Sequence, residues 1–130
     1  RNNDHFNFTS DYKYKDGEFV GKNLIKNETI AFNGYERVSS RSSVYFDTIQ
    51  PYKHHSYTPA TGINLFSFCL FPEKYQPSGP ANLSKIDNLD IEFTIIDDST
   101  IIDNANLKIY GITYNILRIT NGLSGLVFRA

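Results

Sequence analysis

Two adjacent histidines are the residues of this chain whose type and spacing could first suggest chemistry. His54 and His55 could bind a metal ion, but adjacent side chains of an extended segment point in opposite directions. No cysteine or carboxylate lies at the spacing of metal ligands near them. We therefore interpret them as a loop pair that hydrogen-bonds the backbone, and we predict no metal site and no cofactor.

The aspartates do not predict an acid–base pair. Asp97 and Asp98 lie in an expected turn, where Asp is favoured because its side chain bonds the local backbone, and Asp87 suits the same role. Glycoside hydrolysis requires two carboxylates that converge across a cleft. The position of Asp97 and Asp98 in one turn indicates no such arrangement. We therefore expect no catalytic residues and no enzyme.

The single cysteine, Cys69, lies in an apolar run, where a lone cysteine is most often a small buried hydrophobe. One cysteine permits no intrachain disulfide, which favours a reducing compartment or an assembly site over a secreted scaffold. Asn-x-Ser/Thr triplets occur at residues 7–9, 27–29 and 82–84. They arise often by chance in an Asn-rich chain, so glycans are kept as an open alternative among the partners.

Composition limits the classes of protein that remain. The 130 residues allow one ordinary domain, and an apolar content of 40% with 15% aromatics is enough for a β-rich core. The charge is nearly balanced, with 13 basic and 14 acidic residues, which argues against direct binding of nucleic acid. No apolar run is long enough for a transmembrane helix. The chain has no Met and begins at Arg1, so we expect it to be part of a longer polypeptide.

The elements that must position these residues are β-strands. Strands are expected over residues 24–32, 44–49, 65–71, 89–96, 106–114, 116–120 and 126–128. Asn33-Gly34 and Asn121-Gly122 predict tight turns. Residues 1–23 are expected to form a loop or arm, residues 39–43 a serine-rich loop, and residues 81–86 at most one helical turn.

The pattern of these strands indicates the fold class. Apolar residues at 89, 91, 93 and 95 alternate with polar ones, as in a half-buried antiparallel strand, whereas the run 65–71 is apolar on both faces. We predict an all-β antiparallel jelly-roll β-sandwich. A jelly roll has about eight strands, more than are expected here, so residues 24–130 should form an incomplete, C-terminal portion of one.

Several separate motifs follow one another along the chain. They are FNGYER at 32–37, YFDTIQPYKHH at 45–55, TPATGI at 58–63, FSF at 66–68, PEKYQPSG at 72–79, NLSKIDN at 82–88 and YNILRI at 114–119. In this order they resemble the second jelly roll of the major capsid proteins of nucleocytoplasmic large DNA viruses, over residues 24–130. The chain departs from that pattern at Lys85, where arginine is usual, and at residues 67–69 and 97–105.

This resemblance implies a structural virion protein. The family is built as a double jelly roll, three copies of which form a pseudo-hexagonal capsomer that tiles an icosahedral shell. The implied partners are other copies of the chain, the rest of the same polypeptide, neighbouring capsomers and minor capsid proteins. The alternatives are a carbohydrate-binding jelly-roll module and a minor capsid or scaffold paralogue.

Two groups of residues are the candidate structural sites. The first group, predicted to lie in structural loops after the run 65–71, comprises Gln76, Pro77, Ser78, Gly79, Asn82, Ser84, Asp87 and Asn88. The C-terminal motif comprises Tyr114, Asn115, Leu117, Arg118, Gly122 and Gly125. Short polar side chains of the first group should satisfy loop backbone groups, and residues 76–79 form the segment whose loss should most disturb folding or capsomer assembly.

Overall fold

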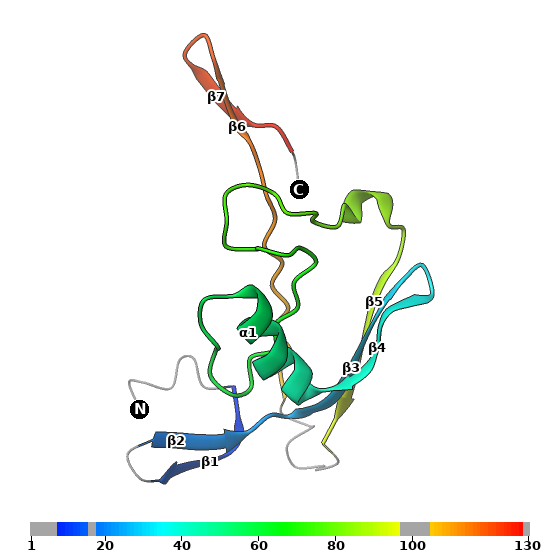
Figure 1. The fold of residues 1–130 in the computed structure, drawn as a ribbon, viewed down its shortest axis with the longest axis vertical. Helices are drawn as coiled ribbons and strands as arrows, with labels where there is room; N and C mark the ends of the chain where they lie inside the picture. The colour runs from blue at the N-terminus through cyan, green and yellow to red at the C-terminus, as the bar shows by residue number, and fades with distance from the viewer. Residues whose placement is uncertain (1–7, 16–17, 97–104, 129–130) are drawn as a thin grey trace.

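A three-stranded antiparallel sheet lies at the centre of the fold. In this computed structural model, which describes residues 8–15, 18–96 and 105–128, strand β3 (Ile25–Phe32) lies between β4 (Tyr35–Ser42) and β5 (Leu89–Ile95). Figure 1 shows the three strands side by side, with α1 beside them. The predicted strands at 24–32 and 89–96 are thereby confirmed, as is the predominance of antiparallel strands.

The turn between β3 and β4 follows from its two residues. Asn33 and Gly34 have φ values of 51° and 80°, both in the left-handed region that a two-residue turn of the Asn-Gly type requires. The turn is as predicted, but the serine-rich loop at 39–43 is wrong, because residues 39–42 belong to β4. Strand β4 lies at the edge of the sheet and is exposed along nearly its whole length. Its polar sequence fits this position, because neither of its faces is buried.

A helical segment replaces the strand predicted at 44–49. The π-helical turn η1 (Tyr45–Ile49) continues directly into α1 (Gln50–His54), and Pro51 lies in the first turn of α1, where its missing N–H costs little. The aromatic and β-branched residues of this stretch favour a strand by propensity. Burial decides otherwise: Phe46 and Gln50, four residues apart, share one helical face and are buried together.

The core is small and aromatic. Phe46 is fully buried and Ile30 is 3% exposed. The Phe46 ring lies 6.3 Å from that of Phe66, which contacts Phe68 edge-on at 4.9 Å, and Phe68 lies 5.5 Å from Phe32 of β3. This row of rings joins the helix, the segment around residue 67 and the central sheet.

The segment 65–71 is not the strand that its apolar run predicted. It makes no ladder with the described strands, although the backbone N–H of Leu65 donates to the Phe46 carbonyl at 3.0 Å. Phe66 and Phe68, which would share one face of such a strand with Leu70, contact each other's rings, whereas Leu70 is 62% exposed. The apolar pattern therefore predicted backbone pairing wrongly and burial only in part, since residues 65–69 are half-buried and residues 70 and 71 are exposed.

Two further hairpins form separate two-stranded sheets. Strands β1 (Ser10–Lys15) and β2 (Glu18–Lys22) pair within the stretch expected to be a loop or arm. An irregular loop is therefore wrong for these residues, while the arm and the boundary near residue 23 stay predictions. Strands β6 (Leu117–Thr120) and β7 (Leu123–Leu126) confirm the strand at 116–120 and its Asn-Gly turn. In Figure 1 this hairpin, in orange and red, projects away from the rest.

The remaining predictions have mixed outcomes. The 3₁₀ turn η2 (Leu83–Lys85) confirms the single helical turn at 81–86. The strand at 106–114 is wrong, since these residues are extended without a ladder, and the last strand ends at residue 126 instead of beginning there. The turn at 97–100 lies outside the described residues. In the part of the chain that the structure describes, no helix has the length and apolar character needed to span a bilayer.

Candidate functional site

The loop of residues 70–79, called here the motif loop, is closed on itself by Ser78. The Ser78 hydroxyl accepts a hydrogen bond from the Phe71 N–H at 2.8 Å, and the Ser78 carbonyl accepts one from the Leu70 N–H at 3.3 Å. Gly79 follows with φ 83°, a conformation that residues with a Cβ rarely adopt. The predicted residue Ser78 therefore satisfies loop backbone groups, as its short polar side chain suggested.

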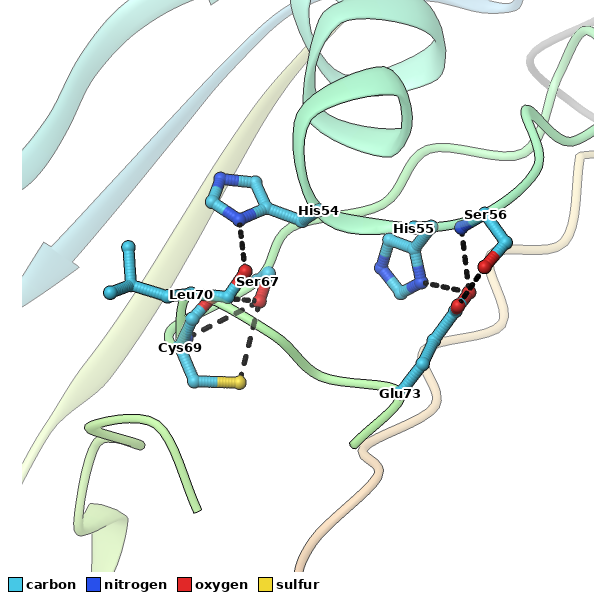
Figure 2. A network of polar contacts seen from close by, with 7 residues as sticks. All are labelled: His54, His55, Ser56, Ser67, Cys69, Leu70 and Glu73. Atoms are coloured by element: carbon cyan, nitrogen blue, oxygen red, sulfur yellow. Dashed lines mark hydrogen bonds and ion pairs between the residues drawn. The ribbon is translucent and has the colours of Figure 1, made fainter. Parts of the chain in front are cut away.

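A carboxylate clasp, formed by His55, Ser56 and Glu73, joins the motif loop to the end of α1. Figure 2 shows the Glu73 carboxylate facing Ser56, which donates to it from both its backbone N–H, at 3.0 Å, and its hydroxyl. His55 Nδ1 lies 3.4 Å from the same carboxylate. The Ser56 hydroxyl, then its backbone N–H and His55, lower the pKa of Glu73 despite some opposing desolvation.

His54 fastens the start of the same loop. Its Nδ1 lies 3.0 Å from the Leu70 carbonyl oxygen, so this nitrogen carries the proton and donates. The interpretation of His54 as a backbone-bonding histidine fits this contact, whereas His55 faces a carboxylate. Among the described residues, no group of three or more His, Cys, Asp or Glu side chains is placed to hold a metal ion.

Cys69 lies beside the motif loop and takes part in a local turn. The Ser67 hydroxyl donates to the Cys69 carbonyl at 2.6 Å and accepts from the Cys69 N–H at 3.3 Å (Figure 2). The thiol is half-buried and lies 3.6 Å from the same hydroxyl. Among the residues that the structure describes, no general base contacts the thiol, in keeping with a packing role.

The tip of the motif loop is exposed and its far side is tied to the C-terminal segment. Tyr75 is fully exposed, while the Lys74 ammonium lies 4.4 Å from the centre of the Phe71 ring. The Tyr114 hydroxyl donates to the Lys74 carbonyl at 2.9 Å. This contact joins the predicted residue Tyr114 to the loop that carries the predicted residues 76–79.

The other predicted loop residues act elsewhere. Asn82 caps η2 by accepting from the Ser84 N–H at 3.2 Å. The Asn88 N–H donates to the Asn33 side-chain oxygen at 2.8 Å, and the Asn33 N–H donates to the Asn88 carbonyl at 2.9 Å. Asn88 therefore joins the β3–β4 turn to the start of β5. Gln76, Pro77 and Asp87 are exposed.

The C-terminal motif builds the β6–β7 hairpin. The Asn115 side chain donates to the Phe128 carbonyl at 2.8 Å and accepts from the N–H groups of Ile116, at 2.8 Å, and Phe128, at 3.2 Å. Arg118 pairs with Gly125 across the hairpin, Leu117 pairs with Leu126, and Gly122 occupies the turn with φ 79°.

A buried polar cluster was missed by the sequence analysis. Glu28 of β3 is 5% exposed and accepts a hydrogen bond from the Asn64 side chain, which in turn accepts one from Asn23 at 2.7 Å. Burial is the main cause that raises the pKa of Glu28; nearby Asp47 also raises it, and the Asn64 bond opposes both. Glu28 lies two residues from buried Ile30, so the period of the strand would have placed it on the inner face.

The carboxylate clasp borders a depression that is smaller than most small-molecule sites. A shallow depression of about 240 Å³ lies beside the clasp, below the range of roughly 300–1,000 Å³ typical of small-molecule sites. It is lined by Lys53, His54, His55, Ser56, Phe71, Glu73 and Lys74. Its one carboxylate is already engaged by Ser56 and His55.

Comparison with known proteins gives matches over most of the chain. A family described as the large eukaryotic DNA virus major capsid protein matches residues 1–125. The major capsid protein of Chrysochromulina ericina virus is 42% identical over 83% of the chain and 19% of its own length, and that of Phaeocystis pouchetii virus is 40% identical over 83% and 21%. The chain thus spans about a fifth of the length of these relatives.

Solved structures agree. A quasi-atomic description of the PBCV-1 virus capsid superposes with a TM-score of 0.64 at 30% identity, over 82% of this chain and 30% of that one. The Faustovirus major capsid protein gives a TM-score of 0.56 at 27% identity, over 64% of this chain and 14% of that one. Similarity to these capsid proteins confirms the predicted antiparallel jelly-roll class. Since the family match extends over nearly the whole described fold, the chain belongs to the major capsid protein family of large eukaryotic DNA viruses.

Proposed function

We propose that the chain is a segment of a structural virion protein that self-associates into trimeric, pseudo-hexagonal capsomers of an icosahedral shell. The observation that carries the proposal is the construction of the motif loop. It is fastened by Ser78, by the carboxylate clasp, by His54 and by Tyr114, yet its tip, Tyr75, is fully exposed.

Such a loop is suited to repeated contacts between identical subunits. A tyrosine loses little conformational entropy on binding and supplies a large contact area, and a pre-organised loop lowers the cost of ordering further. Closed symmetric assemblies present the same contact at every interface, so one rigid loop contributes many times to a shell.

Exposed apolar side chains give independent support. On the β6–β7 hairpin, Ile119 is 70% exposed and Leu123 is 78% exposed, and on the extended segment before it Ile112 is 99% exposed. Large exposed apolar surfaces of this kind mark places where other protein surfaces pack. We expect the rest of the capsid polypeptide and neighbouring copies to be the partners.

The test is the solution mass of the capsid polypeptide that carries this chain, determined by light scattering alongside intact mass spectrometry. We expect a mass three times that of the polypeptide, and a weaker assembly in a Tyr75→Ala variant. Tyr52→Ala is the matched control, because Tyr52 is 82% exposed but belongs to α1 and not to the motif loop. A stable monomer would contradict the proposal.

The carbohydrate-binding alternative has less support. Tyr52 and Tyr57 are exposed, but the depression beside the clasp has no tyrosine in its lining. Within the family, a minor capsid or scaffold paralogue is the alternative, since a protein named probable capsid protein 4 from Acanthamoeba polyphaga mimivirus is 36% identical over 98% of the chain. Localisation to assembled particles in proportion to the shell area would favour the major capsid protein.

A further inference from the structure

Two Asn-Gly pairs lie at the tips of β-hairpins. Asn33 and Gly34, between β3 and β4, have φ values of 51° and 80°, and Asn121 and Gly122, between β6 and β7, have values of 53° and 79°. The two turns thus share their sequence and their backbone conformation. They differ in what holds them.

An Asn-Gly pair is chemically reactive because glycine has no Cβ to hinder approach of its backbone nitrogen to the asparagine side chain. In this reaction the Gly122 nitrogen attacks Asn121 Cγ, a C–N bond forms, and the Cγ–Nδ2 bond breaks. Ammonia leaves with the proton lost from the Gly122 N–H, and a five-membered succinimide remains. Water then adds to either ring carbonyl and leaves an aspartyl or an isoaspartyl residue at position 121, with no oxidation or reduction.

Asn33 is restrained against this reaction. Its side-chain oxygen accepts the Asn88 N–H at 2.8 Å and its own N–H donates to the Asn88 carbonyl at 2.9 Å. Its hairpin is also part of the three-stranded sheet, because β3 pairs with β5 over its whole length. Rotation of the Asn33 side chain onto the Gly34 nitrogen therefore requires loss of contacts with another strand.

Asn121 has no such restraint. Its side chain makes no hydrogen bond with the described part of the chain, and every residue of β6 and β7 is exposed. Among the strands that the structure describes, these two form a sheet of their own, and isolated two-stranded hairpins are marginally stable in water. Local opening of such an element needs far less free energy than opening of a central sheet.

We propose that Asn121 is a site of spontaneous deamidation in the folded chain before other subunits pack on the hairpin, and that Asn33 is protected. The modification places a negative charge at the hairpin tip. In the isoaspartyl form it also lengthens the main chain by one carbon, which a two-residue turn does not accommodate. The fraction of chains modified at Asn121 would therefore increase with the time since synthesis.

The two sites can be compared within one sample. The full chain is incubated folded, and a second portion in denaturant, at neutral pH, and both are analysed by peptide mapping that separates aspartyl from isoaspartyl products. In the folded chain we expect deamidation at Asn121 to exceed that at Asn33 by at least about tenfold, the ratio for opening free energies that differ by roughly 1.4 kcal/mol. In denaturant the two rates should be similar, since both sites are followed by glycine.

A variant tests whether opening of the hairpin controls the rate. Asn115→Ala removes the bonds at the hairpin base and should accelerate deamidation at Asn121 without affecting Asn33, whereas Asn106→Ala, an exposed asparagine ahead of the hairpin, should change neither. Equal rates at the two sites in the folded wild-type chain, or no product at position 121, would overturn the proposal. An unchanged Asn121 rate in an Asn115→Ala chain with an opened hairpin would do the same.

Discussion

Asn115 and Phe128 close the base of the β6–β7 hairpin through a reciprocal pair of hydrogen bonds. The Asn115 amide donates to the Phe128 carbonyl at 2.8 Å, and its oxygen accepts from the Phe128 N–H at 3.2 Å. An asparagine side chain here imitates the backbone of a strand, so the ladder of β6 and β7 continues beyond its last paired residues. The hairpin is exposed throughout, so this closure is the local interaction that we expect to limit its opening.

Replacement of Asn115 should therefore loosen the hairpin locally. In Asn115→Ala the amides of β6 and β7 should exchange with solvent about tenfold faster, the effect of losing roughly 1.4 kcal/mol of hydrogen bonding. Amide exchange measured by NMR or mass spectrometry gives the result. Asn106→Ala should leave these rates unchanged, and equal acceleration throughout the central sheet would show that the effect is not local.

Phe46 should be the most sensitive core position. Its side chain is fully buried among other aromatic rings, and Phe46→Ala should lower the free energy of unfolding by about 3–5 kcal/mol through lost burial and a residual cavity. Should that variant fail to fold, Phe46→Leu gives a smaller loss in the same direction. Tyr52→Ala, on the exposed side of α1, should change stability by less than about 0.5 kcal/mol in the same denaturant titration.

Gly62 should tolerate no side chain. Its φ is 93°, and a Cβ at this position would lie 2.5 Å from the Phe8 carbonyl oxygen. Gly62→Ala should destabilise the fold by roughly 1–3 kcal/mol, since the backbone is in the left-handed region and the neighbouring atom is main chain. Gly111→Ala is the control, because a Cβ there meets nothing within 4 Å. Similar thermal midpoints for the two variants would contradict this expectation.

Burial of Glu28 should make stability fall as pH rises. Because burial raises the pKa of this carboxyl above its usual value of 4.5, the folded chain binds the proton more tightly than the unfolded chain. Its contribution is complete below the unfolded pKa and is lost as pH rises through the folded pKa. Glu28→Gln should remove this part of the pH dependence, which denaturant titrations across pH would measure.

The Asn64 side chain should matter for the same buried group. Asn64→Ala leaves the Glu28 carboxylate without this donor and should cost roughly 1–3 kcal/mol at neutral pH. Asn64→Asp should cost more, since it brings a second negative charge to the cluster. In a Glu28→Gln background the difference between the two variants should shrink, and an unchanged difference would refute the link.

The carboxylate clasp should respond to acid in the opposite sense. The Ser56 hydrogen bonds lower the pKa of Glu73, so the clasp is intact above the unfolded value of 4.5 and is lost as pH falls through the lower folded pKa. An NMR titration should show the Ser56 amide resonance following Glu73. Glu73→Gln should abolish that response, whereas replacement of exposed Glu36 by Gln should preserve it.

Local sequence rules predicted the two Asn-Gly turns, because an Asn-Gly pair fixes its own backbone, but they did not predict the β1–β2 hairpin. The turns at Asn33 and Asn121 depend on two residues each and needed no knowledge of the rest of the chain. The helix at Phe46 was beyond such rules, since the residues favour a strand and burial against distant rings decides the outcome. The buried Glu28 could have been found from the period of its strand, but its partner Asn64 lies 36 residues away.

In the candidate site, too, local contacts could be predicted from the sequence and contacts between distant segments could not. Ser78, Asn82 and Asn115 bond backbone groups within their own loops, as short polar residues in turns should. The contacts of Glu73 and Tyr114 join segments 17 and 40 residues apart, and no motif spacing specifies them. Sequence patterns therefore identified the loop, and the tertiary structure was needed to see how it is fastened.

The bond between Asn33 and Asn88 has a consequence for the order of folding. These residues are 55 positions apart, so the β3–β4 hairpin can form early, while β5 must wait for closure of a long loop. During synthesis at roughly 5–20 residues per second, β3 has an unpaired edge for about 3–11 s before β5 is made. Over that interval the backbone of this edge can pair with other exposed strands. In a cell that makes many copies of a capsid protein, those strands come from other unfinished copies of the same chain.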